Sequence, residues 1–183
     1  ARETASFEDV IEMAGGTPLI IKVARGTHGN GVVLAETPKA AKAVMQTFYV
    51  EGVNFLVQEF VKESAGVDIR VLVVGGRVVA SVKRQSLDGD FRSNTHQGGE
   101  GVPVKLTEEE HKTALKAAKA MGLSSFCGVD MMRSDHGPLV LEVNSSASIK
   151  TPELITQRDV ATKIIAYIEQ NAKRQHKKDR VGA

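Results

Sequence analysis

Two carboxylates and an amide lie close together in an otherwise apolar part of the sequence. Asp130 ends the run Cys-Gly-Val-Asp, and Glu142 and Asn144 end the run Leu-Val-Leu-Glu-Val-Asn. Two apolar runs around a polar turn with Gly and Pro predict a β-hairpin. With the turn centred on His136, Asp130 would lie opposite Glu142, and strand alternation would place Asn144 on the same face. Because facing like charges are unfavourable and three oxygen ligands suit Mg²⁺ or Mn²⁺, the hairpin predicts a divalent metal site. The alternative is a solvated hairpin face in another register.

A lysine and a glycine-rich loop near the N-terminus could bind phosphate. Lys22 interrupts the apolar run Leu-Ile-Ile-Lys-Val, and the loop that follows contains Gly26, Gly29 and Gly31. Glycines between paired strands let backbone amides approach phosphate oxygens, and a partly buried lysine requires an anionic partner. The alternatives are an ordinary turn and a lysine that snorkels from a strand edge. The loop is not a Walker A loop, because Val32 stands where that pattern has Lys.

Charged residues also alternate with apolar ones on two strands predicted for residues 67–74 and 77–85. Asp68 and Arg70 share one face of the first strand, and Arg84 lies on the second. Two arginines on a sheet face suit the recognition of a carboxylate or a phosphate, and a salt-bridged, solvated face is the alternative. This pattern makes Arg70 and Arg84 candidate substrate-binding residues.

The elements that must position these residues are mostly hairpins. Strands are predicted near residues 18–24, 32–36, 54–61, 67–74 and 77–85 and in the metal-candidate hairpin, with helices near 37–50, 107–121 and 158–171. Few helices among runs of strands favour an α+β fold with mainly antiparallel sheets over a doubly wound fold. We expect a small lobe over residues 1–61, a larger lobe over 62–172 and a basic disordered tail over 173–183, with the ligand in a cleft between the lobes.

Composition excludes several classes of protein. The 183 residues contain 42% hydrophobic residues but no run near the ~20 that a membrane span requires. The single Cys127 predicts a reduced core residue in a cytoplasmic protein. No Ser-His-Asp or Cys-His nucleophile is recognisable among the five scattered histidines. The basic tail could touch nucleic acid, but a frayed terminus is the simpler interpretation, so we expect no direct nucleic-acid binding and no membrane association.

Together the motifs resemble the nucleotide-binding part of an ATP-grasp ligase of the RimK type, from about Gly15 to about Ile168. The matching stretches are Pro-Leu-Ile-Ile-Lys ending at Lys22, the glycine-rich loop and the strand after it at 26–36, Val-Gln-Glu-Phe-Val-Lys-Glu at 57–63, Asp-Ile-Arg at 68–70, Gly-Asp-Phe-Arg-Ser-Asn at 89–94 with His96 and Gly98-Gly99, Gly-Val-Asp at 128–130 and Leu-Glu-Val-Asn at 141–144. The resemblance implies an ATP-grasp fold, in which two lobes with mainly antiparallel sheets grip the nucleotide between them.

The same resemblance assigns roles to individual residues. Lys22 and Arg92 would bind ATP phosphates and assist the chemistry. The rest of the ATP site would consist of Gly26, Gly29 and Gly31 in the loop, Glu59 and Phe60 at the adenine and ribose, Asp68 at the ribose, and Ser93 and Asn94 beside Arg92. Asp130, Glu142 and Asn144 would hold Mg²⁺ or Mn²⁺, with two ions expected.

By resemblance, the activity is the ATP-dependent ligation of glutamate to the C-terminus of small-subunit ribosomal protein S-six, through an acyl phosphate, with a homo-oligomer as a possible assembly. A related ligase with another acid and amine, or a non-catalytic ATP-binding fragment, is the alternative. The chain departs from the family at residues 145–148, Ser-Ser-Ala-Ser, where a small residue, Ser, Pro and Gly are usual. We expect that this change alters acceptor recognition. The family also carries an N-terminal domain of roughly a hundred residues before the nucleotide lobes, and this sequence does not include it.

Overall fold

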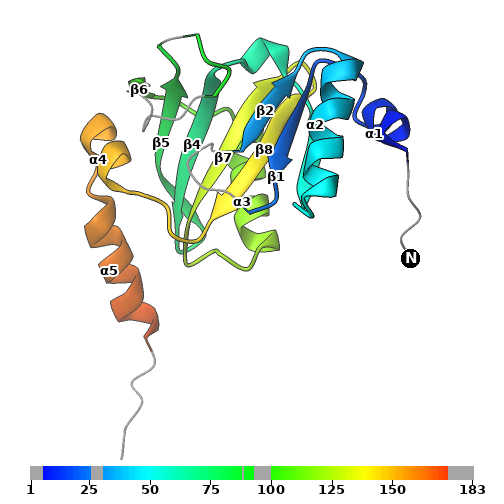
Figure 1. The fold of residues 1–183 in the computed structure, drawn as a ribbon. Coiled ribbons are helices and arrows are strands. Elements are labelled where there is room, and N and C mark those ends of the chain that lie inside the picture. The colour runs from blue at the N-terminus through cyan, green and yellow to red at the C-terminus, as the bar shows by residue number, and fades with distance from the viewer. Residues whose placement is uncertain (1–5, 26–30, 88, 93–99, 173–183) are drawn as a thin grey trace, which may run out of the picture. The chain divides into compact units, whose positions relative to one another are not determined.

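The computed structural model describes residues 6–25, 31–87, 89–92 and 100–172. Helices and strands alternate in groups along the chain (Figure 1). Their order is α1 (Phe7–Met13), β1 (Leu19–Val23), β2 (Val32–Ala35), α2 (Pro38–Val50), β3 (Phe55–Glu59), a 3₁₀ turn η1 (Lys62–Ser64), β4 (Val67–Val74), β5 (Arg77–Gln85), β6 (Glu100–Pro103), α3 (Glu108–Ala120), β7 (Phe126–Ser134), β8 (Gly137–Asn144), α4 (Lys150–Thr156) and α5 (Val160–Asn171).

The chain divides into two compact units. Unit 1 consists of residues 1–68, 83–101 and 132–139, and unit 2 consists of residues 69–82, 102–131 and 140–183. The described part of the chain contains no helix that is both long enough and apolar enough to cross a bilayer.

In unit 1, a three-stranded antiparallel sheet has the order β2-β1-β3. Leu19 and Ile21 of β1 are completely buried and pack in one cluster with Ala41 and Met45 of α2. Helix α2 begins where Thr37 accepts a hydrogen bond from the third residue along and a proline occupies the first turn, which is the usual start of a helix. Alternation along β1 therefore buries one face of this sheet under helices and leaves the other face for Lys22.

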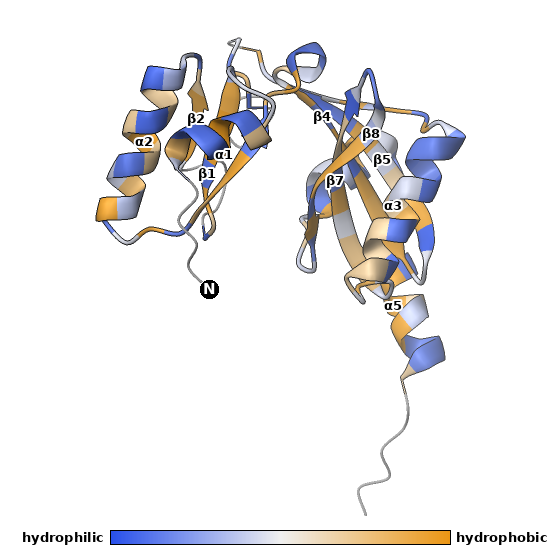
Figure 2. Cartoon of the chain, turned by 90° about the vertical axis from the view of Figure 1, so that its right-hand side faces the viewer, coloured by the Kyte–Doolittle hydropathy of each residue, from blue (hydrophilic) through white to orange (hydrophobic). Residues whose placement is uncertain are grey.

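Unit 2 is built around a sheet with the order β6-β5-β4-β7-β8. One face packs on α3, where Val71 and Val129 meet Ala114 and Ala118 in a buried cluster. The other face buries Leu72 against a second cluster that includes Val160 at the start of α5. Figure 2 shows β7 largely in hydrophobic colours, whereas α3 is hydrophilic on much of its surface, as expected for a helix that covers a sheet.

The strand and helix predictions agree with these elements at most positions, and the α+β class with antiparallel sheets is confirmed. Two short helices, α1 and α4, were missed. Strand β6 lies in a segment for which the sequence analysis predicted neither a helix nor a strand. Cys127 is buried as predicted, and burial raises the pKa of its thiol.

Candidate active site

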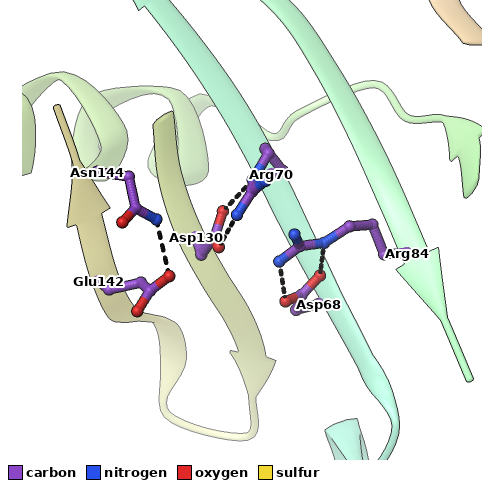
Figure 3. Close-up of polar contacts among 6 residues, drawn as sticks. All are labelled: Asp68, Arg70, Arg84, Asp130, Glu142 and Asn144. Atoms are coloured by element: carbon purple, nitrogen blue, oxygen red, sulfur yellow. Dashed lines mark hydrogen bonds and ion pairs between the residues drawn. The ribbon is translucent and has the colours of Figure 1, made fainter. Parts of the chain in front are cut away.

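Asp130 on β7 forms a two-pronged ion pair with Arg70 on β4. The antiparallel register places the two residues directly opposite each other. The Arg70 Nε and Nη2 groups donate to the two carboxylate oxygens of Asp130 at 2.8 and 2.6 Å (Figure 3). The Asp130 side chain is 4% exposed and that of Arg70 16%. Such parallel bonds are the strongest geometry for this type of pair, so Asp130 has a compensating charge within the protein.

Glu142 and Asn144 lie on the same face of the sheet as Asp130. Val143, between them, packs against the buried cluster that contains Val129, the neighbour of Asp130 along β7. Because side chains alternate along each strand, the residues on either side of these two valines point to the opposite face. The amide nitrogen of Asn144 donates to Glu142 Oε1 at 2.7 Å (Figure 3), which leaves the amide oxygen as the natural ligand atom.

These three residues fit a hard divalent cation by their chemistry. Two carboxylates and one amide oxygen on one face are the kind of ligands that Mg²⁺ and Mn²⁺ prefer. Among the described residues no group of three His, Cys, Asp or Glu side chains could hold a metal, and the candidate set here combines two carboxylates with the amide of Asn144. The prediction of facing like charges considered only the hairpin. In the structure, Arg70 of β4, on the other side of β7, compensates the charge of Asp130. The loop between β7 and β8 comprises Asp135 and His136, where the sequence predicted the turn.

The segment after Asn144 packs on Gly128 of β7. A Cβ atom added to Gly128 would lie 2.6 Å from the Ala147 Cβ and 3.9 Å from the Arg70 Nε. Ala147 occupies the position at which the resembled family usually has proline. The departure at 145–148 therefore lies against the strand that carries Asp130, which the sequence did not reveal.

In unit 1, Asp68 and Arg84 form a second buried ion pair. Arg84 Nε donates to Asp68 Oδ1 at 2.6 Å, and Arg84 Nη2 donates to Asp68 Oδ2 (Figure 3). The side chains are 5% and 6% exposed. Both arginines that we proposed as substrate-binding residues thus hold an aspartate, Arg84 on Asp68 and Arg70 on Asp130.

The end of β3 and the segment around Arg92 lie together, although they are some thirty residues apart. The rings of Phe60 and Phe91 meet edge to face with centroids 6.4 Å apart, and the Gly66 N–H donates to the Phe91 carbonyl at 2.8 Å. Arg92 donates to Asp90 through Nε at 3.0 Å and Nη2 at 2.6 Å, and its guanidinium lies 5.5 Å from the Phe91 ring centroid. The hydrogen bond from Arg92 lowers the pKa of Asp90.

Lys22 lies on the face of the three-stranded sheet opposite to the helices. Its direct neighbours across the ladders are Val32 and Leu56. Lys22 is half-buried, and within the described residues its ammonium has no ion-pair partner. Gln58, two residues along β3 from Leu56, shares this face, whereas Glu59 points to the other. Gln58 was missed as a candidate, although alternation along the strand could have identified it.

Gly31 closes the loop between β1 and β2. It has a φ of +74°, and its carbonyl accepts a hydrogen bond from Val23 at 3.0 Å. The predicted site residues Gly26, Gly29, Ser93 and Asn94 lie outside the described residues.

Unit 2 also has a pocket of about 440 Å³. Its lining includes Lys105, His111 and Arg158 together with apolar residues of β5 and of segment 103–106. None of the predicted site residues lines this pocket.

Similarity to known proteins identifies the class of this fold. Over 90% of this chain and 50% of the other, it superimposes on the ATP-grasp ligase PsnB complexed with a phosphomimetic variant of minimal precursor, Mg and ADP, with a TM-score of 0.65 and 22% identity. The fold is therefore that of the ATP-grasp proteins.

Residues 1–168 match the RimK-like ATP-grasp domain, so the chain belongs to the RimK-like ATP-grasp family. It is 55% identical over 180 residues to a Hydrogenovibrio crunogenus protein named "Probable alpha-L-glutamate ligase", covering 98% of this chain and 60% of that protein. A protein of the same name from Maridesulfovibrio salexigens is 54% identical over 172 residues, covering 94% and 57%. The chain thus spans less than two thirds of the length of these curated relatives.

Proposed function

We propose that this chain is the nucleotide-binding part of an ATP-dependent ligase that joins the amine of glutamate to a carboxylate acceptor. The observation that supports this most strongly is the 55% identity, over almost the whole chain, to a relative named as an alpha-L-glutamate ligase. The acceptor that we propose is the C-terminus of small-subunit ribosomal protein S-six, in the cytoplasm.

The residues of unit 1 would bind the nucleotide. Lys22, on the helix-free face of its sheet, would contact phosphate oxygens, because a half-buried ammonium is stabilised by an anion. Glu59 would contribute backbone groups to the adenine, since its side chain points to the other face. Phe60, held against Phe91, would give the base apolar cover. Arg92 would add positive charge near the phosphates, after leaving its bonds to the Asp90 carboxylate.

The residues of unit 2 would hold the cation. Asp130, Glu142 and Asn144 supply three oxygen ligands from two neighbouring strands on one face of the sheet, and two ions are proposed. Mg²⁺ or Mn²⁺ bound there would neutralise charge on the phosphate oxygens.

The reaction would proceed in two displacements. The acceptor carboxylate oxygen attacks the γ-phosphorus of ATP, the bond to the β-phosphate oxygen breaks, and ADP leaves. The glutamate amine then attacks the acyl carbon, an amide bond forms, phosphate leaves, and the amine loses one proton. Lys22 would stabilise the negative charge that accumulates on the transferred phosphoryl group. No nucleophilic side chain is required, which agrees with the absence of a recognisable Ser-His-Asp or Cys-His set in the sequence.

The test is ligation followed by intact-mass spectrometry. The chain is incubated with ATP, Mg²⁺, glutamate and ribosomal protein S-six, and the Hydrogenovibrio relative is incubated in parallel. Each glutamate adds one residue mass to the acceptor. Product from the relative but none from this chain would refute the ligase activity of this chain. Product from neither would refute the acceptor.

A ligase of the same chemistry with another acceptor is the second candidate. It is favoured by Ala147 and Ser148, which stand where the family usually has proline and glycine, with Ala147 lying against Gly128. Offering carboxylates and amines of several classes, with ADP release as the readout, separates it from a fragment that binds ATP without turnover.

A further inference from the structure

We propose that Arg70 competes with the divalent cation for Asp130. In the absence of metal, the guanidinium holds the carboxylate that the cation requires, and it must leave when the cation binds. This inference deepens the proposed function, since it rests on Asp130 being a metal ligand. It assigns Arg70 a role as a positioning residue that sets cation affinity, in addition to the substrate contact expected from sequence.

The backbone register makes the competition unavoidable. Arg70 and Asp130 are directly opposite each other on paired strands, so no local loop movement can separate them. Each carboxylate oxygen of Asp130 accepts one bond from the guanidinium, at 2.8 and 2.6 Å. A cation that binds either oxygen would therefore stand within a few ångströms of a positive group.

Burial makes this repulsion strong. The Asp130 side chain is 4% exposed, and like charges interact more strongly where water is excluded. The surroundings also limit how Arg70 can withdraw. Ala147 covers Gly128 beside the guanidinium, with the site of an added Gly128 Cβ only 3.9 Å from Arg70 Nε. A displaced guanidinium would be a largely buried charge without its partner, which is costly.

An anionic ligand would then compensate the charge of the displaced Arg70 guanidinium. Once Arg70 leaves Asp130, a phosphate or carboxylate of the bound substrate can accept its two parallel bonds. Cation binding would consequently be weak by itself and stronger when an anion arrives with it. In this way the ion pair would prevent the site from holding a bare cation.

The first experiment observes the ion pair in the unaltered chain. The Nε–H signal of Arg70 is followed in ¹H–¹⁵N NMR spectra, identified by its loss in Arg70→Lys, and titrated with Mg²⁺. We expect the signal to move upfield or to broaden through solvent exchange as the bond to Asp130 breaks. A signal that stays unchanged while Mg²⁺ saturates the site would overturn the competition.

The second experiment measures Mn²⁺ affinity from the electron paramagnetic resonance of the unbound ion. Arg70→Gln should bind Mn²⁺ at least about tenfold more tightly than the parent chain, since a close repulsion is removed. The matched control is Arg84→Gln, which removes a guanidinium that is more deeply buried than that of Arg70 from Asp68, and it should change the affinity less than about threefold. Arg70→Lys keeps the positive charge but cannot form the two parallel bonds of a guanidinium. Its Mn²⁺ affinity should lie between that of the parent and that of Arg70→Gln, which provides a second test should the glutamine variant fail to fold.

The Asp130→Asn variant distinguishes the proposed competition by Arg70 from the proposed metal role of Asp130. Loss of Mn²⁺ binding in this variant, together with tighter binding in Arg70→Gln, supports both. Loss in Asp130→Asn with equal or weaker binding in both Arg70 variants overturns the competition and leaves the metal role intact. Unchanged binding in Asp130→Asn, or no binding by any variant, overturns the proposed metal role itself.

Discussion

Replacing Gly128 by alanine should destabilise the protein through a single contact. The added Cβ would lie 2.6 Å from the Ala147 Cβ, whereas carbon atoms pack best at about 3.5–4.0 Å. Relief therefore requires a displacement of about 1 Å, either of β7 or of the segment after β8. Overpacking of this kind costs about 1–3 kcal/mol.

The displacement should also reach the candidate metal site. Gly128 lies two residues before Asp130 on β7, and Ala147 lies three residues after Asn144. In a chain of this length, each kcal/mol lowers the melting temperature by roughly 2–4 °C, so Gly128→Ala should lower it by roughly 2–12 °C. Urea unfolding, with hydrogen exchange at the β4 and β7 amides, measures the effect and locates it.

The double variant Gly128→Ala/Ala147→Gly tests the cause. Removing the Ala147 methyl group opens the space that the new Cβ requires, so the double variant should be more stable than the sum of the single effects predicts. A coupling free energy of about 1 kcal/mol or more is expected for residues in contact. Strictly additive effects, or a Gly128→Ala variant as stable as the parent, would contradict the packing described for this strand.

Three further predictions concern unit 1 and helix α3. The Arg92 hydrogen bond lowers the pKa of Asp90. The pair therefore stabilises the folded state above the ordinary aspartate pKa of about 4, and this contribution is lost as the pH falls through the lowered value. Arg92→Ala should raise the titration midpoint of the Asp90 carboxyl in ¹³C NMR, and an unchanged midpoint would exclude the bond. Gly31 has a φ of +74°, and a Cβ added to it would lie only 2.6 Å from Val23 of β1. Gly52 has a similar φ of +66° but no atom within 4 Å of an added Cβ. Gly31→Ala should therefore lower the free energy of unfolding in urea by about 1–3 kcal/mol more than Gly52→Ala, and equal losses would be inconsistent with the clash. Thr107 caps α3 in a reciprocal capping box, so Thr107→Ala should cost about 1 kcal/mol and Thr107→Ser should cost much less, with the opposite order speaking against the cap.

Local signals in the sequence were sufficient for most of the fold. The Gly-Gly turn between β4 and β5, the Thr-Pro start of α2 and the Thr107 cap of α3 are short-range features, and the elements begin and end where these features predict. Helix α1 has a comparable signal, because Ser6 forms a capping box with Asp9, but an aspartate stands where glutamate is usual. Helix α4 lacks any side-chain cap, so the sequence offered no signal for its start.

The candidate site was predictable in its residues but not in their partners. Asp130, Glu142 and Asn144 were identified from spacing within one hairpin. Arg70 is sixty residues from Asp130, and the pairing of β4 with β7 is a tertiary event that no local pattern encodes. For the same reason the contact between Phe60 and Phe91, which joins two predicted parts of the nucleotide site, could be recognised only in three dimensions.

The most direct test of the proposed nucleotide and metal site is ATP binding by calorimetry with and without Mg²⁺. Asp130→Asn is the appropriate variant, because alanine would leave the largely buried Arg70 charge without an acceptor. Asp135→Asn in the exposed turn of the same hairpin is the control. Mg²⁺ should tighten ATP binding by about tenfold or more in the parent and in Asp135→Asn, and should have little effect in Asp130→Asn. ATP affinity that is independent of Mg²⁺ in the parent, or equally enhanced in Asp130→Asn, would contradict a cation held by this hairpin.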